Sequence, residues 1–162
     1  MAEDDNGVRF YGQDMIFITG NKSSSSEQGG TLYMSIGATN TATEDIIFAK
    51  TVSVKPSNLI SFSVTLIAEG QDFHNVVLKN SAPAGLTYKG VILVDSKPKS
   101  GDLSLGINIG TIKDGEKAVV FFQECVNRPY DFSYGITDLN NKITVSSRET
   151  KDNTGDILIS VN

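Results

Sequence analysis

The chain is poor in several residue types on which common functions depend. Its 162 residues include no tryptophan, one histidine and one cysteine. No apolar run approaches the roughly 18 to 20 residues that a membrane-spanning helix needs, so we expect no membrane span. Without tryptophan, a sugar-binding site would lack the broad aromatic face that lines many such sites. The single histidine leaves few candidates for acid–base catalysis.

The charge balance and the missing catalytic motifs argue against two classes of function. The chain carries 14 basic and 19 acidic residues, and no basic patch is interleaved with aromatic residues, so we expect no nucleic-acid partner. A G-x-S-x-G nucleophile motif is absent. His74, close to Asp72 and beside Asn75, is typical of a surface or strand-edge histidine rather than of a general base. We therefore predict that the protein is not an enzyme and uses no cofactor.

The only cysteine, Cys125, cannot form a disulfide within the chain. It lies in the segment Phe121–Val126, where period-two alternation places it on the same face as Phe121 and Gln123. A small packed thiol is the favoured interpretation, since unpaired cysteines are mostly buried. The alternative is a disulfide between assembled subunits, which an odd cysteine permits.

Period-two alternation is the main pattern of the sequence. Apolar strand candidates separated by turns of Gly, Pro, Asn and Asp include residues 45–54, 59–68, 86–94, 103–109, 118–126 and 156–161. Alternation bounded by such turns is typical of half-buried antiparallel strands, and no helical period of useful length is present. The sequence therefore predicts an all-β fold, an antiparallel β-sandwich of about seven to ten strands.

The first 45 residues carry more strand candidates than one sandwich domain needs. Asp14–Thr19 is a strand candidate, Gly20–Gly30 is a flexible loop rich in serine and glycine, and Thr31–Gly37 alternates. We expect residues 1–45 to form a strand-bearing N-terminal extension and residues 46–162 to form the sandwich domain. The extension can pair at a sheet edge of its own domain, or it can leave and pair with a neighbour.

Two segments of the sequence together resemble a known family. They are Asn75-Val76-Val77 with Pro83-Ala84-Gly85-Leu86-Thr87-Tyr88, and Ile109-Gly110 with Ile112, Gly115, Glu116, Val119, Val120 and Phe122. This order resembles the Ig-like repeat domain found in many bacterial and some archaeal cell-surface proteins. The resemblance covers about residues 46–162. It departs from the family at Ile107, where a tryptophan is common, and at Glu69-Gly70-Gln71, which replaces a usual turn. It implies an Ig-like antiparallel sandwich.

By this resemblance we expect a non-enzymatic structural subunit of a cell surface or of an extracellular filament, such as a pilus or a spore appendage. Self-assembly by strand donation is the expected mechanism, because an open sheet edge invites a strand from another chain. The expected partner is another copy of the chain, with other surface proteins as further candidates. The candidate donor residues are Val8, Phe10, Ile16, Phe17 and Ile18. The alternative is that Val8–Thr19 pairs within its own sandwich.

Two further sites are minor hypotheses. Surface sandwiches of Ig-like type sometimes join a first-strand lysine to a last-strand asparagine by an isopeptide bond, and Lys50 with Asn162 or Asn153 is the available pair. A solvent-facing strand lysine is the simpler interpretation. Calcium binding by Asp152–Asp156 or by Asp4–Asn6 is the second hypothesis. Polar turns explain both segments, since neither has the full spacing of a calcium loop, and we predict no metal site.

Two other functions stay open. An adhesin or carbohydrate-binding module would hold its ligand in the loops at one end of the sandwich. A cluster of exposed tyrosines among Tyr11, Tyr88, Tyr130 and Tyr134 would favour that function. A passive spacer repeat of a longer surface protein is the third possibility, and it would need no ligand.

The first residues bear on where the protein resides. Met1–Asp5 is followed by neither a basic n-region nor an apolar h-region, so it is not a secretory signal peptide. We expect either that a signal has been removed, or that the protein is made in the cytoplasm and reaches an extracellular or cell-surface site by another route. A spore-surface protein released when its mother cell lyses fits the second case.

Overall fold

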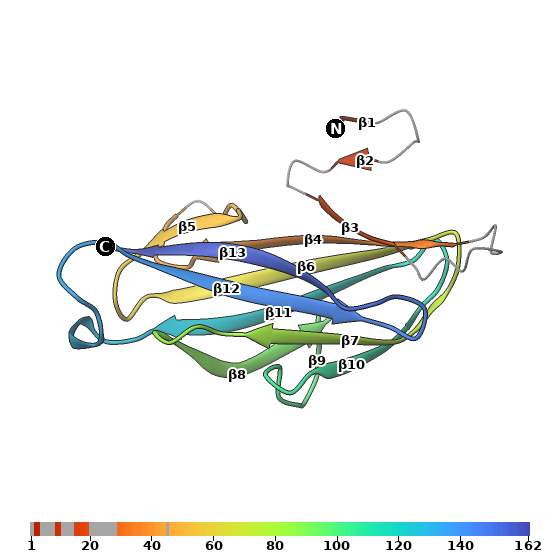
Figure 1. The fold of residues 1–162 in the computed structure, drawn as a ribbon. Coiled ribbons are helices and arrows are strands. Elements are labelled where there is room, and N and C mark those ends of the chain that lie inside the picture. Colours follow the sequence, from red (N-terminus) through yellow and green to blue (C-terminus); the bar gives the residue numbers. More distant parts are fainter. Residues whose placement is uncertain (1, 4–8, 11–14, 20–28, 45) are drawn as a thin grey trace.

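The main body of the molecule is a pair of β-sheets packed face to face (Figure 1). The computed structural model describes residues 2–3, 9–10, 15–19, 29–44 and 46–162. In these residues the helical structure is one 3-10 turn, η1 (Pro129–Asp131). No helix in that part of the chain has the length and hydropathy that crossing a bilayer requires. The all-β sandwich predicted from the alternation is confirmed.

The first sheet has six strands in the order β3-β4-β6-β11-β8-β9, and every neighbouring pair is antiparallel. Its strands are β3 (Met15–Thr19), β4 (Thr31–Asn40), β6 (Leu59–Glu69), β8 (Leu86–Val94), β9 (Lys97–Pro98) and β11 (Lys117–Val126). Long ladders join β6 to β4 and to β11, so these three strands form the centre of the layer.

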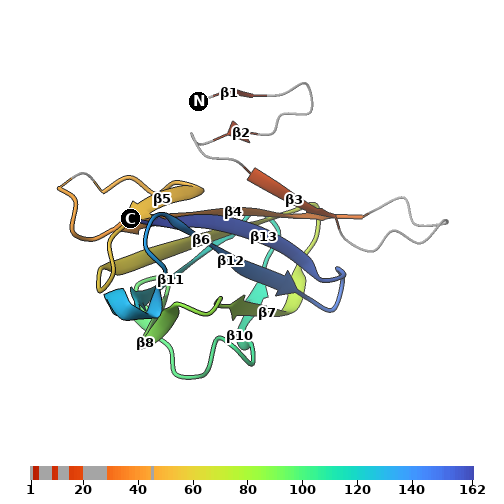
Figure 2. The same ribbon diagram turned by 60° about the vertical axis from the view of Figure 1, so that its left-hand side comes forward.

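The second sheet has five strands in the order β10-β7-β12-β13-β5. Its strands are β5 (Thr51–Val54), β7 (Phe73–Ser81), β10 (Ile107–Ile112), β12 (Thr137–Ser146) and β13 (Asn153–Val161). β5 and β13 run parallel, and the other neighbours are antiparallel. Figure 2 shows β5 at the side of the sandwich next to the end of β13. A separate two-stranded sheet joins β1 (Ala2–Glu3) to β2 (Arg9–Phe10).

Alternating residues of the long strands form one hydrophobic core. On β11 every second residue from Ala118 to Val126 is buried, and β6 follows the same alternation. Phe62 of β6 stacks on Phe122 of β11 with the ring centroids 4.8 Å apart, and both rings are fully buried. Each large apolar side chain buried in this way contributes about 1.5–3 kcal/mol. Apolar burial between the two inner faces therefore holds the layers together.

The N-terminal part of the chain supplies an inner strand of this core. β4 pairs with β6 along its whole length and with β3 on its other side. Most β4 side chains are buried. β4 thus belongs to the same sandwich as the strands after residue 46, although it lies before the predicted domain boundary. Whether residues 46–162 fold without residues 1–45 stays a prediction.

One predicted strand begins later than its alternation indicated. The segment 103–106 is a turn, and β10 starts only at Ile107. Asp102 explains the difference: its carboxylate accepts hydrogen bonds from the backbone N–H and the hydroxyl of Ser104, and its carbonyl accepts one from the N–H of Gly106. This local turn chemistry outweighs the strand pattern of the leucines.

The segment 45–54 is also only partly a strand. Ala49 forms an isolated bridge with Ala38 of β4, whereas the next residues, Thr51–Val54, form β5 in the second sheet. Ile46 and Ile47, which precede the bridge, are exposed. The chain therefore crosses from the first sheet to the second at Lys50. After the crossing, β5 covers the side of the sandwich only beside the C-terminal half of β13.

The turn before β8 requires a glycine at position 85. Gly85 has a φ of +108°, a conformation that side chains with a Cβ rarely adopt. A Cβ at this position would lie 3.0 Å from the ring of Phe132 and 3.1 Å from Leu139. The Pro83–Gly85 turn thus packs directly beneath the loop that joins η1 to β12.

Candidate functional site

The predicted donor segment contains the outermost strand of the first sheet. β3 pairs antiparallel with Thr31–Ser35 of β4 in the same chain. The described strands hold these donor candidates: Phe10 in β2, and Ile16, Phe17 and Ile18 in β3. Val8 lies outside the described residues. β3 therefore pairs within its own sandwich, and donation of the N-terminal segment to a neighbour stays a prediction.

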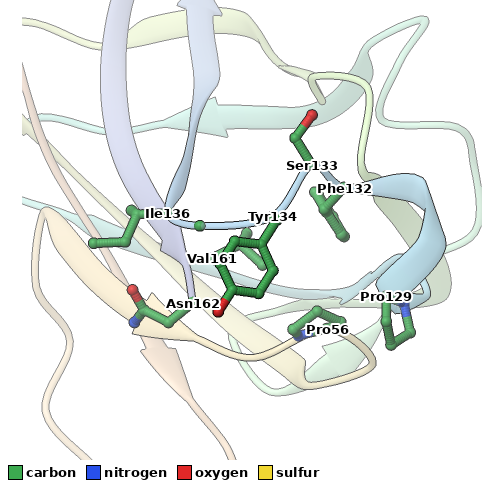
Figure 3. A pocket seen from close by; sticks show the side chains of 9 residues that line it. Pro56, Pro129, Phe132, Ser133, Tyr134, Ile136, Val161 and Asn162 are labelled. Atoms are coloured by element: carbon green, nitrogen blue, oxygen red, sulfur yellow. The ribbon is translucent and has the colours of Figure 1, made fainter.

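A groove of about 580 Å³ opens at the end of the sandwich where the C-terminus lies (Figure 3). The turn before β6, the loop between η1 and β12 and the end of β13 line it, and Pro56, Phe132, Tyr134, Ile136 and Val161 are among the lining residues. Tyr134 is fully exposed, and the side chain of Ile136 is 73% exposed. The groove thus presents apolar and aromatic surface to solvent.

Two of the four tyrosines that could mark a ligand site lie in η1 and in the loop that follows it. Tyr130 of η1 is 76% exposed and sits four residues before the fully exposed Tyr134. Arg128 packs over the Tyr130 ring, and its guanidinium donates a hydrogen bond to the tyrosine hydroxyl. Tyr88 is half-buried elsewhere on β8, and Tyr11 lies outside the described residues. The exposed tyrosines therefore gather beside the groove.

A second hollow of about 360 Å³ adjoins the groove at Asn162, which lines both. Asn40 organises its wall. The Asn40 amide donates hydrogen bonds to the carbonyl of Ser53 and to the side-chain oxygen of Asn58, while its own oxygen accepts one from the backbone of Ala42. The Asn40 amide is thus occupied within the protein, whereas Asn162 is exposed beside the aromatic residues of the groove.

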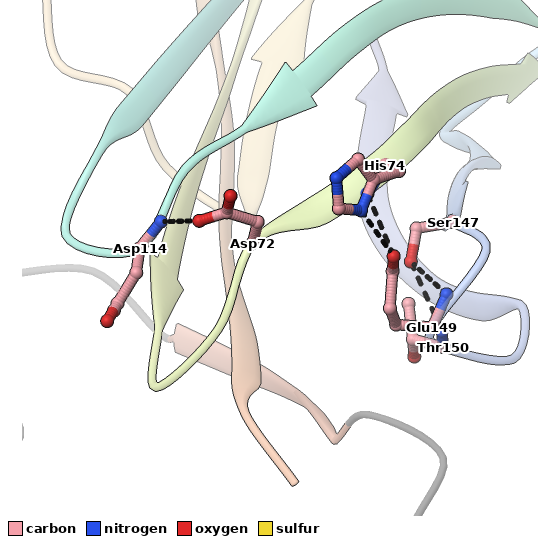
Figure 4. A network of polar contacts seen from close by, with 6 residues as sticks. All are labelled: Asp72, His74, Asp114, Ser147, Glu149 and Thr150. Carbon is pink, nitrogen blue, oxygen red and sulfur yellow. Dashed lines mark hydrogen bonds and ion pairs between the residues drawn. The ribbon is translucent and has the colours of Figure 1, made fainter.

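His74 belongs to a surface network at the end of β7 that lies away from the loop between η1 and β12 (Figure 4). Its Nδ1 lies 2.6 Å from one carboxylate oxygen of Glu149, and the other oxygen accepts the backbone N–H of His74. Burial alone would raise the pKa of Glu149, but these hydrogen bonds and the charge of His74 lower it. Ser147 accepts the backbone N–H of Glu149, and Asp72 accepts that of Asp114. The network ties the β12–β13 turn to β7.

A buried acid is the feature that sequence reasoning missed. Glu124 of β11 is fully buried and accepts a 2.7 Å hydrogen bond from the side-chain amide of Asn80 on β7, across the two sheets. Burial raises the pKa of Glu124 to about 7, although this hydrogen bond acts to lower it. An acidic residue at an inward position of the 118–126 alternation was the signal that could have revealed it.

The polar side chains buried in the core, Glu124, Asn80 and Asn141 among them, are incompletely paired. Asn141 of β12 is also fully buried, and Asn80 pairs in register with Ile143, two residues further along β12. Among the described residues, one oxygen of Glu124, the oxygen of Asn80 and both polar atoms of Asn141 have no hydrogen-bond partner. Buried polar atoms without partners cost stability. Because the group is closed to solvent, no substrate reaches it in this conformation.

Cys125 lies on the outward face of β11, together with Phe121 and Gln123, as the alternation predicts. It is half-buried, and its sulfur lies 3.4 Å from the carbonyl of Val126 and 3.8 Å from that of Ser57. It is thus less buried than a thiol packed in the core. A disulfide between subunits stays a prediction.

The structure does not bring Lys50 and Asn162 together. β5 and β13 pair in parallel, with Thr51 opposite Leu158 and Val54 opposite Val161. Asn162 therefore lies beyond the far end of β5, about 16 Å along the strand from Lys50. Asn153, the other candidate, begins β13, and its amide donates to the carbonyl of Lys151. This geometry gives no support to the isopeptide bond.

The calcium hypothesis rests on two segments that the structure treats differently. Asp152–Asp156 spans the β12–β13 turn and the start of β13. Within the described part of the chain, no group of three His, Cys, Asp or Glu side chains has an arrangement that could hold a metal ion. Asp4–Asn6 lies outside the described residues.

Comparisons with known proteins find the fold but no sequence family. No family model matches the sequence, and no curated protein matches it. Among solved structures, the major pilin subunit BcpA of Bacillus cereus is similar with a TM-score of 0.55 at 9% identity, over 99% of this chain and 47% of that one. A variant of the same pilin gives a TM-score of 0.50 at 10% identity, over 80% and 41% of the two chains.

A third match is weaker. A family 123 glycoside hydrolase from Clostridium perfringens gives a TM-score of 0.46 at 12% identity, over 80% of this chain and 27% of that one. The chain spans about half the length of the pilin subunit. At these identities the likeness shows the fold alone, an all-β sandwich of two sheets. Membership in the Ig-like repeat family is not shown.

Proposed function

We propose that the protein is a non-enzymatic structural subunit of a bacterial or archaeal cell surface or of an extracellular filament, and that copies of the chain assemble by pairing of β-strands. The observation that carries this proposal is the N-terminal segment. Its strand β3 lies at a sheet edge and reaches β4 only through residues 20–30. An edge strand on such a connection, or the residues that precede it, can pair with the sheet of a neighbouring copy. The fold shared with a pilin subunit supports the same function.

The energetics of such an assembly are favourable. A donated strand forms inter-chain backbone hydrogen bonds, each with a net value of about 0.5–1.5 kcal/mol. Each large apolar side chain that becomes fully buried adds roughly 1.5–3 kcal/mol. A few such contacts repeated along a filament suffice for stable association, and neither a cofactor nor a catalytic step is required. The expected location is extracellular or at the cell surface, the spore surface included.

Truncation tests this function. A chain that lacks residues 1–19 should fold, because β4, β6 and β11 remain, but it should stay monomeric by light scattering at concentrations where the full chain associates. A variant that lacks residues 1–14 keeps β3: if it stays monomeric, the residues before β3 make the contact, and if it associates, β3 itself makes it. Association of the chain lacking residues 1–19 to the same extent as the full chain would contradict strand donation, and an unfolded product would show that the segment belongs to the domain's own core.

A second function, that of an adhesin or carbohydrate-binding module, is favoured by one specific observation. Tyr134 is exposed on the loop that lines the groove, Tyr130 is exposed in η1 just before that loop, and the amide-lined hollow adjoins the groove. Aromatic side chains next to a few polar groups are a lining that a sugar ligand can use. A passive spacer would make no use of such a surface.

A panel of soluble oligosaccharides tests this second function. Binding should be lost in the Tyr134→Ala variant, whose stability should be unchanged because the ring is fully exposed. Leu105→Ala, an exposed position on another loop, is the control and should bind like the unmodified chain. No binding by the unmodified chain would remove this candidate.

A further inference from the structure

The edge of the second sheet is complete along only half of β13. β12 pairs with β13 from Asn153 to Val161 on one side. On the other side, β5 pairs only with Leu158–Val161. Among the described residues, no strand pairs with the outer edge of 153–157. Within the part of the chain that the structure describes, half of this edge is therefore open.

The open edge presents a defined set of hydrogen-bonding groups. The backbone N–H of Leu158 donates to the carbonyl of Lys50, and that of Asn162 donates to the carbonyl of Val54. Even-numbered residues of β13 thus direct their backbone groups toward β5, since successive residues of a strand alternate sides. Thr154 and Asp156 follow the same parity, so each presents an N–H and a C=O along the open edge. The odd-numbered residues direct theirs toward β12.

The first sheet is wider at this place than the second. β3 extends it beyond Thr31–Ser35 of β4, and Figures 1 and 2 both show β3 on the same side of the sandwich as the start of β13. The inner face of β13 is buried here at Gly155 and Ile157. One strand added to β13 would therefore give the second sheet a counterpart to β3. The open edge ends where the chain crosses between the two sheets at Lys50.

We propose that this open edge, with Thr154 and Asp156 at its centre, is the acceptor site for an extended N-terminal segment of a second copy of the chain. The inference rests on the proposed assembly function and names both partners of the contact. β3 stays in its own sheet, and the residues before β3 of one copy pair with β13 of the next. The contact is head-to-tail, so it repeats along a filament.

The N-terminal segment has the properties of such an occupant. Its two described strands, β1 and β2, pair with each other at only two positions, Ala2 with Phe10 and Glu3 with Arg9, and join neither main sheet. An isolated two-stranded ribbon is marginally stable in water. Little is therefore lost when this ribbon opens, and the segment that contains Phe10 gains the hydrogen-bonding groups of Thr154 and Asp156.

Proline at residue 156 tests the site. Asp156→Pro removes one N–H from the open edge and places its ring in the path of the incoming strand, but it leaves every hydrogen bond to β12 intact, because proline is tolerated where the N–H faces solvent. Asp156→Ser keeps the N–H and is the matched control. The proline variant should be folded by circular dichroism and should need a concentration about tenfold higher to associate. The serine variant should associate like the unmodified chain.

Hydrogen exchange adds an independent readout. The amides of Thr154 and Asp156 should exchange fast in dilute protein and become protected as copies associate. Protection that persists on dilution would mean that the chain fills its own edge, and it would overturn the inference. Association that the proline variant retains in full would also overturn it, while leaving the assembly function standing. A full-length chain that stays monomeric at every concentration would contradict both.

Discussion

At the scale of single residues, Glu124 is the least expected feature of the core. Its neighbours on the inward face of β11 are Ala118, Val120, Phe122 and Val126, all apolar. Asn80 supplies one hydrogen bond, and burial raises the pKa of Glu124 to about 7. A raised pKa means that the folded chain binds this proton more tightly than the unfolded chain does. Stability should therefore fall as the pH rises from about 4.5 to about 7.

The Glu124→Gln variant should lose this pH dependence. The neutral amide keeps an oxygen that accepts the hydrogen bond from Asn80, but it never has to ionise in the core. The free energy of unfolding of the variant relative to the unmodified chain should therefore rise by about 3 kcal/mol between pH 4 and pH 8. Urea unfolding at the two pH values measures this difference.

Glu44→Gln, an exposed loop position, is the control and should shift the unfolding free energy equally at both pH values. A difference for Glu124→Gln that is the same at pH 4 and pH 8 would contradict the account of a buried acid that resists ionisation.

Gly85 provides a second test at this scale. Gly85→Ala should destabilise the fold by about 2–4 kcal/mol, since it combines a strained positive φ with contacts of about 3 Å to Phe132 and Leu139. Gly90→Ala has a similar positive φ of +78° but open space around it, so it should cost only about 1 kcal/mol. Thermal unfolding of both variants separates the two effects. Equal losses of stability in the two variants would show that the close packing against Phe132 does not contribute to the cost of Gly85→Ala.

At the scale of elements, the sequence predicts strands well where only burial decides. The central strands β6 and β11 follow their apolar alternation almost residue for residue. Prediction from the alternation fails where a polar side chain competes with strand pairing, as when the hydrogen bonds of Asp102 form a turn before β10. It also cannot assign partners. Alternation does not reveal that β5 pairs in parallel with only part of β13, so the open edge could not be found from the sequence.

The position of β3 gives a prediction at this scale. Thr19 lies opposite Thr31 in the β3–β4 ladder, at a separation that a disulfide can span. Cysteines at these two positions, with Cys125→Ser to prevent mispairing, would lock β3 to its own sheet. If the residues before β3 are the donor, the oxidised protein should associate as well as the same protein after reduction. Association only after reduction would show instead that β3 itself is exchanged between copies.

At the scale of the whole molecule, the sandwich joins two surfaces of different kinds. One is the open edge of β13 beneath β3, and the other is the groove with Tyr134 at the end where the C-terminus lies. Sequence reasoning identified the donor segment and the tyrosines as candidates, because each is a local pattern. It could not place Lys50 relative to Asn162, or bring Asn80 to Glu124, because these depend on how distant strands pair.

The central claim is that copies of this chain assemble by themselves. Negative-stain electron microscopy of the purified full-length chain, at high concentration and without any partner, tests it most directly. The account predicts filaments of regular width that disappear when residues 1–14 are removed. Dispersed particles that stay monomeric by light scattering would contradict it, and would shift the function toward the groove and its tyrosines.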